Sequence, residues 1–268
     1  MKYKRNDRSL TEEKVRSRKM AAHQMHGKAP KPKKKNTFRE YSEAIFVALL
    51  AAIFLRAFVV QAFRIPTGSM KDTLLVGDFL LVNKFIYGVR TPDRIPLVDA
   101  RIPFFRLPAF KSPKNGDVVV FKYPKEEKLD YIKRCLAVGG QTVEIRNDEV
   151  FVDGRPEGER LDLGRKFDEE EGRYVHYTKI TTPYGKSYAI RHYGDGFDRN
   201  ENFGPVTVPP GHYFMMGDNR DNSADSRVWG FLSHKNVVGE ALIIYFSWDK
   251  GEDLFYMIRW SRIANLIH

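Results

Sequence analysis

One long apolar run near the N-terminus constrains this chain more than any other feature. Residues 44–63 read AIFVALLAAIFLRAFVVQAF, and Arg56 and Gln61 are the only polar side chains in the run. Twenty helical residues rise about 30 Å, which matches the hydrocarbon core of a bilayer. Arg56 lies toward the far end, where its guanidinium can reach the lipid headgroups. We therefore predict one transmembrane helix over residues 41–63.

Two other interpretations of this run remain open. A buried core helix is one, although such a helix is rarely so uniformly apolar. A cleaved signal peptide is the other, because Val60-Gln61-Ala62 fits the small-x-small rule for cleavage. The same triplet leaves self-cleavage after Ala62 possible. The 40-residue leader, the length of the run and its internal arginine favour an uncleaved anchor.

Positive charge is concentrated before the apolar run. Residues 1–40 contain 14 Lys or Arg against 4 Asp or Glu, whereas the other 228 residues contain 31 against 30. Such a basic segment with few apolar residues is typical of a disordered tail. By the positive-inside rule, this tail lies in the cytoplasm and everything after residue 63 lies on the far side of the membrane. The charge therefore belongs to the tail and does not predict nucleic-acid binding by the folded part.

Short apolar segments separated by turn signals follow the anchor and predict strands. Examples are residues 79–84, 117–123 and 131–138, with a hairpin pattern over 142–152. We predict a mainly β fold in which residues 64–154 and 206–268 form a coiled antiparallel sheet. The polar stretch 155–205 predicts a smaller inserted cap or second domain.

Two further features set limits on chemistry and membrane contact. Cys135 is the only cysteine, so an internal disulfide is excluded, and neither cysteine nor histidine spacing predicts a metal site. We expect no metal and no cofactor. Residues 89–113 hold five prolines and several apolar side chains. This loop is either an ordinary connection or an apolar rim that dips into the membrane interface.

Ser69 and Lys133 are candidates for a catalytic pair. Ser69 follows the apolar run closely, and a serine hydroxyl becomes a nucleophile only when a neighbouring base takes its proton. Lysine has an ordinary pKa of about 10.4, but burial lowers it by up to about 3–5 units. In a strand Lys133 would share an apolar face with Tyr131 and Cys135, while Arg134 points the other way. Taken singly, each residue is more often a turn serine or a surface lysine.

The chain resembles a known family in four segments taken together. They occur in one order after the apolar run, at residues 65–74 (IPTGSMKDTL), 116–121 (GDVVVF), 131–140 (YIKRCLAVGG) and 217–227 (GDNRDNSADSR). These segments resemble the motif boxes of bacterial type I signal peptidases, which are Ser/Lys-dyad serine proteases. One departure is Asp72, where the family usually has a proline before Thr73. We expect the missing proline to loosen the turn after Ser69.

The resemblance implies roles for individual residues. Ser69 would attack the scissile carbonyl and form the acyl-enzyme, with Lys133 as the general base that later activates water. The Ser69 backbone N–H and the Thr67 hydroxyl would form the oxyanion hole, and Ser223 would orient the lysine amine. The remaining matched positions would support the site structurally: Asp218, Asn219, Arg220, Asp225 and Arg227.

The resemblance also implies the substrate and the location. We expect a membrane-anchored serine endopeptidase that removes N-terminal signal peptides from exported preproteins at the outer face of the bacterial cytoplasmic membrane. Small substrate residues at positions −1 and −3 would fit a pocket formed by Ile65, Ile132 and Ala137. The expected partners are preproteins and the phospholipid membrane, without nucleic acid.

Two alternatives are kept beside this interpretation. A self-cleaving repressor-type Ser/Lys protease would share the β fold, but it predicts a soluble chain with a DNA-binding module and no anchor. A membrane-tethered scaffold without enzymatic activity would use the basic tail to bind anionic lipid or nucleic acid. It predicts that replacement of Ser69 or Lys133 changes nothing measurable.

Overall fold

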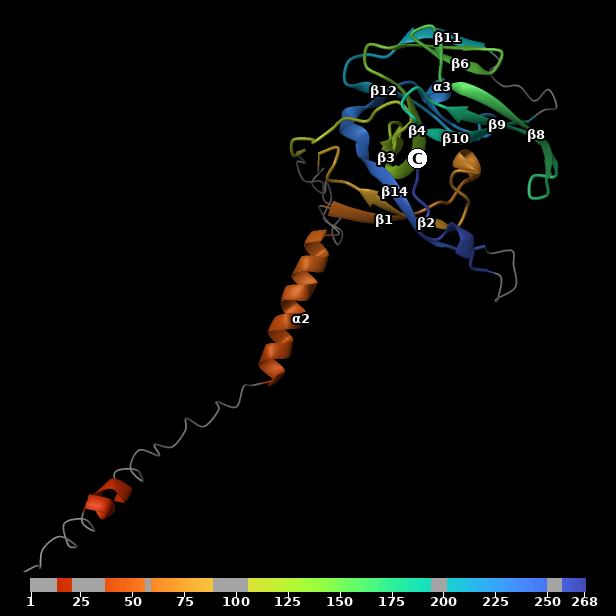
Figure 1. The fold of residues 1–268 in the computed structure, drawn as a ribbon. Coiled ribbons are helices and arrows are strands. Elements are labelled where there is room, and N and C mark those ends of the chain that lie inside the picture. The colour runs from red at the N-terminus through yellow and green to blue at the C-terminus, as the bar shows by residue number, and fades with distance from the viewer. Residues whose placement is uncertain (1–13, 21–36, 56–58, 89–105, 194–201, 250–256) are drawn as a thin grey trace, which may run out of the picture. The chain divides into compact units, whose positions relative to one another are not determined.

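The structure is a computed structural model that describes residues 14–20, 37–55, 59–88, 106–193, 202–249 and 257–268 (Figure 1). The chain divides into two compact units, Met1–Leu50 and Ala51–His268. Most of the basic tail lies outside the described residues. Residues 14–20 form a short exposed helix within the tail that was predicted to be disordered. Lys, Arg and Met favour a helix there, although all of its side chains are exposed.

Helix α2 covers most of the predicted anchor but ends earlier than expected. It runs over Thr37–Phe54, and its described side chains are exposed. In the described parts of the chain, no helix reaches the combined length and hydropathy that a membrane span requires. The predicted helical end at residue 63 is wrong, because Val60–Arg64 form strand β1.

Pairing with a neighbouring strand explains where the helix prediction failed. Strand β1 lies antiparallel to β2 (Asp78–Asn83), with Val60 opposite Asn83 and Arg64 opposite Phe79. A β-branched residue such as Val60 favours a strand once a partner is available. Ala62 lies within this paired strand, opposite Leu81. The peptide bond after Ala62 therefore lies in a hydrogen-bonded strand.

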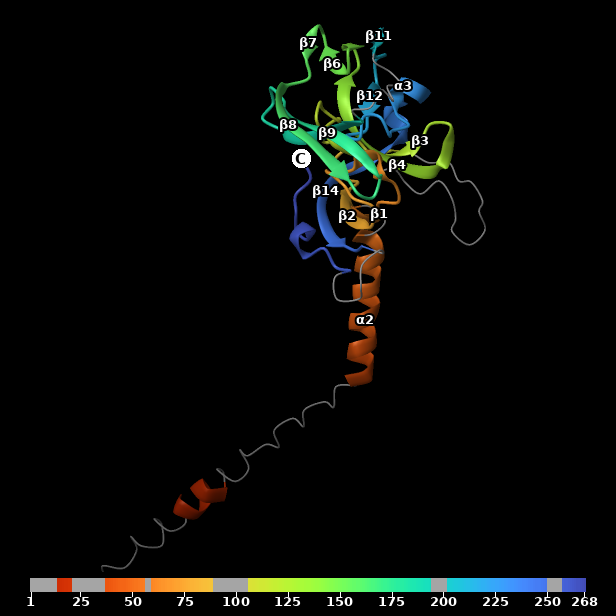
Figure 2. The ribbon, with the colours of Figure 1, turned by 90° about the vertical axis from the view of Figure 1, so that its right-hand side faces the viewer.

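A seven-stranded antiparallel sheet forms the centre of the body (Figures 1 and 2). Its strands lie in the order β1, β2, β14 (Val237–Ser247), β3 (Val118–Tyr123), β4 (Glu126–Val138), β12 (His212–Met216) and β13 (Leu232–Ser233). Strand β14 pairs with both β2 and β3 and shifts register at bulges along its length. The prediction of a mainly β, antiparallel fold is confirmed.

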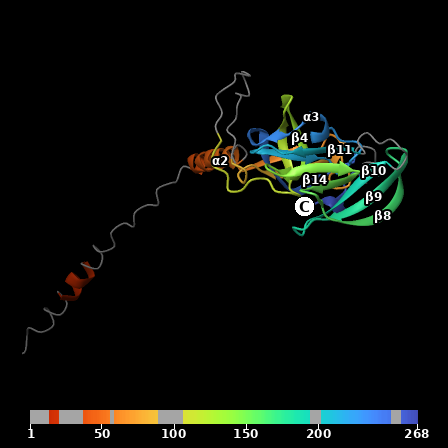
Figure 3. The ribbon, with the colours of Figure 1, turned by 90° about the horizontal axis from the view of Figure 1, so that it is seen from above.

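Two smaller sheets complete the body. One has the order β11 (Asn202–Thr207), β5 (Thr142–Arg146), β6 (Glu149–Val152) and β7 (Arg155–Pro156). The other has the order β10 (Ser187–Tyr193), β9 (Arg173–Thr181) and β8 (Glu159–Asp168), and Figure 3 shows these three strands side by side. Both ends of the predicted insert 155–205 thus pair within the four-stranded sheet. A separate sheet is formed only by residues from Glu159 to Tyr193.

Both faces of the central sheet are buried, as strand β3 shows. Val118 and Val120 pack in one apolar cluster, whereas Val119 and Phe121 pack in another. A strand covered on both faces reads as a continuous apolar run, which is the pattern of residues 118–121. Consequently a polar side chain in the buried part of β4, residues 133–137, needs a partner.

Candidate functional site

Ser69 lies in a tight turn that the apolar core holds in place. The turn is the 3-10 helix η2 (Gly68–Met70), in which Ser69 is 9% exposed and Met70 is fully buried. Lys71 N donates to Gly68 O at 3.0 Å, and Leu74 N donates to Met70 O at 2.7 Å. Because Met70 and Leu74 pack in the same apolar cluster, the position of the Ser69 backbone is fixed by core packing on its C-terminal side.

Lys133 reaches Ser69 from strand β4, as the sequence predicted. Its Nζ lies 2.6 Å from Ser69 Oγ in a buried hydrogen bond, and it donates to Ile132 O at 2.9 Å. Only 4% of Lys133 is exposed. Burial lowers its pKa to about 8, although the charges of Asp225 and Asp218 act in the opposite direction. The amine is therefore largely uncharged above about pH 8 and can accept a proton from the hydroxyl.

Asn219 binds the backbone carbonyl oxygens of Gly68 and Ser69. Its N–H donates to Ser69 O, and its side-chain Nδ2 donates to Gly68 O, both at 3.1 Å. Two hydrogen bonds from one residue hold two successive carbonyls, so the turn cannot rotate without losing both. The sequence assigned Asn219 only a general supporting role, and this geometry makes that role specific.

Asp218 joins the Ser69 turn to the strand that carries Lys133. Thr73 Oγ1 donates to Asp218 Oδ2 at 2.6 Å. Arg134 donates to the same carboxylate from Nε at 2.8 Å and from Nη2 at 2.7 Å. Both partners of this ion pair are almost fully buried. A two-pronged arginine–carboxylate contact of this kind also fixes direction, which orients β4 relative to Thr73.

Arg134 is the main site residue that the sequence reasoning missed. It was expected only to point away from Lys133, yet it is fully buried and its guanidinium lies 3.6 Å from the centroid of the Tyr188 ring. The signal was an arginine inside an apolar strand that is covered on both faces. Such a charge is tolerated only with a buried partner, and the Asp-rich segment 217–227 was the available source.

Ser223 does not make the predicted hydrogen bond with Lys133. Its Oγ is buried and has no hydrogen-bond partner. Gly217 lies between Ser223 and the Ser69 turn. A Cβ atom at position 217 would lie 2.4 Å from both Ser223 Oγ and Ser69 O. Glycine is therefore required at position 217. The orienting role of Ser223 stays a prediction.

The other predicted support residues form ion pairs. Arg227 donates to Asp225 from Nε and Nη2, each at 2.9 Å, and Asp225 also accepts from Gly217 N at 3.2 Å. Asp225 caps the short helix α3 (Ser226–Trp229). Arg220 Nη2 donates to both oxygens of Glu157, at 3.0 and 2.9 Å. Glu157 is buried, and no local sequence pattern predicted it.

The remaining predicted residues differ in where they lie. Thr67 precedes the turn in an extended conformation; it is exposed and forms no capping hydrogen bond. Ile65 belongs to one apolar cluster, and Ile132 packs against it. Ala137 is fully buried in a different cluster, so the structure does not bring it together with the other two predicted pocket residues.

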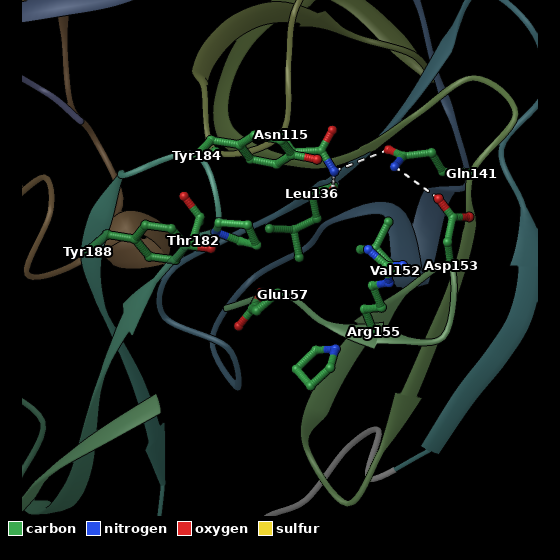
Figure 4. Close-up of a pocket in the computed structure, with 13 residues that line it drawn as sticks. Asn115, Leu136, Gln141, Val152, Asp153, Arg155, Glu157, Thr182, Tyr184 and Tyr188 are labelled. Atoms are coloured by element: carbon green, nitrogen blue, oxygen red, sulfur yellow. Dashed lines mark hydrogen bonds between the residues drawn. The ribbon is translucent and has the colours of Figure 1, made fainter. Parts of the chain in front are cut away.

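A cavity of about 510 Å³ lies apart from Ser69 and Lys133 (Figure 4). Asn115, Gln141 and Asp153 form a chain of hydrogen bonds along one side, with donor–acceptor distances of 3.1 Å. These amides and the carboxylate thus satisfy one another. Across the described ranges, no group of three His, Cys, Asp or Glu side chains is placed to hold a metal ion.

Comparisons with known proteins bear on this arrangement. Residues 38–248 match the family described as signal peptidase, peptidase S26. The chain is 39% identical over 220 residues to signal peptidase I of Pseudomonas aeruginosa, an alignment that covers 78% of this chain and 72% of that protein. Identity to signal peptidase I of Pseudomonas fluorescens is 36% over 236 residues, covering 84% and 78%. For signal peptidase I of Aquifex aeolicus it is 35% over 236 residues, covering 76% and 82%.

Proposed function

This chain belongs to the signal peptidase family, peptidase S26, and is a serine endopeptidase in which we propose that Ser69 is the nucleophile and Lys133 the general base. One observation carries this assignment of roles. The Lys133 amine lies 2.6 Å from the Ser69 hydroxyl inside the protein, and burial brings its pKa to about 8. A lysine in this state is a base of suitable strength near neutral pH.

The first half of the reaction is acylation. Uncharged Lys133 Nζ removes the proton from Ser69 Oγ as the oxygen attacks the scissile carbonyl carbon. The C–N bond of the peptide then breaks, and the resulting ammonium returns the proton to the leaving amine. Ser69 carries the signal peptide as an ester. In the second half Lys133 removes a proton from water, whose oxygen attacks the ester carbon. The ammonium then returns this proton to Ser69 Oγ as the ester C–O bond breaks.

Two donors are proposed for the oxyanion that forms during the attack. They are the Ser69 N–H and the Thr67 hydroxyl, which lie on the same turn. The exposed Thr67 side chain makes no capping bond and is therefore available to a substrate. Ser223 is proposed to orient the lysine amine. Uncharged Lys133 needs one N–H for Ile132 O, and its second N–H is left for a nearby acceptor such as the unpartnered Ser223 Oγ.

The substrate and the location follow as further parts of the proposal. We infer that exported preproteins bind in extended form with small residues at −1 and −3, and that Ile65 and Ile132 limit the size of these residues. Residues 41–59 would anchor the chain, with the basic tail in the cytoplasm and the catalytic body outside. Leucine in place of alanine at −1 or −3 of a preprotein should then abolish cleavage, which mass spectrometry of the products would measure.

The experiment that tests the catalytic roles is cleavage of a preprotein by the detergent-solubilised full chain. Ser69→Ala and Lys133→Ala should each remove cleavage, and Thr67→Val should lower kcat about 10²–10³-fold. Thr67→Ser, which keeps the hydroxyl, is the matched control and should retain activity. Cleavage by the Ser69→Ala or Lys133→Ala variant would refute the role of that residue. The alternative of a scaffold without activity is not supported by the comparisons.

A further inference from the structure

Lys71, two residues after Ser69, is bound by carboxylates from a distant turn. Its Nζ lies 2.9 Å from Asp168, 2.6 Å from Glu170 and 3.4 Å from Glu171. These three residues occupy the end of β8 and the turn that leads into β9. Only 12% of the Lys71 side chain is exposed. The three-stranded sheet thus holds the chain segment that immediately follows Ser69 in the sequence.

The backbone conformation of Asp72 explains why the segment after Ser69 needs contacts from other parts of the chain. Its φ angle is +78°, a left-handed conformation that is unfavourable for residues other than glycine. Proline cannot occupy this position without a change in the turn, because its ring fixes φ near −65°. A non-glycine residue keeps such a conformation only where its surroundings determine it. The departure from the family pattern at residue 72 therefore comes with a different backbone conformation.

Arg191 connects the acidic turn to Asp72 and to the backbone of Asp218. The side chain is fully buried and lies 2.7 Å from Asp168, 3.2 Å from Glu171 and 3.7 Å from Asp72. Its backbone N–H donates to Asp218 O at 3.0 Å, next to the residue that holds Ser69 O. The contacts close a ring that runs from Ser69 through Asp72 and Arg191 to Asn219 and back to Ser69.

We propose that Asp168 and Arg191 are positioning residues that, through Lys71 and Asp72, hold the Ser69 turn in the direction that aims Oγ at Lys133 Nζ. This inference rests on the proposed function, because it assigns a role in the same reaction. The part of these two residues is to replace the local rigidity of a proline with ion pairs from a separate sheet.

The charges in this ring persist over the pH range in which the catalytic lysine titrates. Burial works against ionisation of Asp168, but hydrogen bonds from Lys71 and Arg191 outweigh it and lower its pKa to about 2. Burial likewise opposes the charge on Lys71, yet Glu170 and Asp168 keep its pKa above the ordinary value. The pair of Asp168 and Lys71 thus stays charged from acidic to alkaline pH, whereas burial raises the pKa of Asp72. Loss of this pair should change the rate without moving the pH profile.

The test compares Asp168→Asn and Lys71→Met with wild type in preprotein cleavage, measuring kcat, KM and the pH profile. We expect kcat to fall about 10- to 100-fold, since a displacement of about 1 Å costs of that order. KM should stay within about twofold and the acid limb of the profile should not move. Lys71→Arg, which preserves the charge, should restore most of kcat. Glu169→Gln is the matched control, because Glu169 is an exposed carboxylate in the same turn.

A second pair of variants keeps the test informative if Asp168→Asn folds poorly. Asp72→Gly accepts the positive φ angle but loses the carboxylate that lies 3.7 Å from Arg191, so it should lose less activity than Asp72→Pro, which cannot adopt this φ angle. Wild-type kcat in both Asp168→Asn and Lys71→Met, or full activity of Asp72→Pro, would overturn the positioning role. Cleavage by Ser69→Ala would instead overturn the proposed function, so the two failures are distinguishable.

Discussion

Lys71 is close to Ser69 in the sequence and Lys133 is close to it in space, and the surroundings of the two lysines are opposite. Lys71 contacts three carboxylates, and its pKa lies above the ordinary value. Lys133 is buried on β4, and within the described residues no ion pair joins it to a carboxylate. Its pKa falls to about 8, mainly through burial. The environment, rather than the residue type, therefore makes Lys71 a structural cation and Lys133 a base.

The partners of Asp218 explain in part why Lys133 forms no ion pair with a carboxylate. Asp218 is one of the two carboxylates that act on Lys133 from a distance. Its oxygens are taken by Arg134 and Thr73. Arg134 therefore satisfies a carboxylate that would otherwise favour the charged form of its neighbour. The arginine and the lysine are adjacent in the sequence, and the strand gives them different partners.

The largest expected effect comes from replacing Lys133 by arginine, with the same replacement at Lys71 as the comparison. Arginine keeps the positive charge but cannot lose its proton near neutral pH. Lys133→Arg should therefore lower kcat/KM by about 10⁴-fold or more, as severely as alanine. Lys71→Arg should retain most of the activity. Equal losses in the two variants, measured by preprotein cleavage, would remove the distinction between them.

The next effect concerns Arg134. Arg134→Met leaves the buried Asp218 carboxylate without its partner, which should lower the free energy of unfolding by about 3–5 kcal/mol. The freed charge should also raise the pKa of Lys133 and move the acid limb of the activity profile to higher pH. Denaturant unfolding and a pH series measure the two changes. Adding Asp218→Asn should reverse the shift of the limb, and a limb that stays at high pH would contradict this account.

A smaller change would give Lys133 a carboxylate like those around Lys71. The Tyr131 ring centroid lies 5.4 Å from Lys133 Nζ. Tyr131→Glu should raise the pKa of the lysine by about one unit, so that the wild-type acid limb near pH 8 moves upward. Activity at pH 7 should fall about tenfold and recover at alkaline pH. Tyr131→Gln, with the same shape and no charge, should leave the limb in place.

The smallest effect is expected from Glu170, the exposed member of the acidic turn. Its side chain is 71% exposed although it lies 2.6 Å from Lys71. Exposed ion pairs contribute about 0–1 kcal/mol. Glu170→Gln should therefore change kcat by less than about twofold, in contrast to Asp168, whose side chain is only 9% exposed. A loss as large as that of Asp168→Asn would show that burial does not rank these carboxylates.

The sequence predicted the strands well because local patterns report them. The apolar segment 117–123 predicted a strand, and the antiparallel class followed from short strands and turns; burial on both faces emerged only from the structure. The end of the first helix was missed, because pairing of β1 with β2 is a tertiary effect that residues 60–64 do not show alone. The boundary of the insert was hidden for the same reason.

Some residues of the candidate site could be predicted from the sequence, and others could not. Ser69 and Lys133 were identified through the family resemblance, and the structure brings them together. Asp168, Glu157 and Arg191 were not identified. Each belongs to a polar segment in which charged residues are common. Only the folded chain shows that Glu157 and Arg191 are buried and that the Asp168 side chain is 9% exposed. Long-range ion pairs leave no local pattern that could separate them from solvated charges.

Cys135 offers a way to observe the catalytic sheet directly. It is the single cysteine of the chain, is fully buried, and lies two residues from Lys133 on the same strand. Burial raises the pKa of its thiol, so neither access nor the reactive thiolate is available in the folded protein. A thiol reagent can therefore label the chain only when β4 opens. The labelling rate would report how often the strand that carries the base separates from its neighbours, without any added probe.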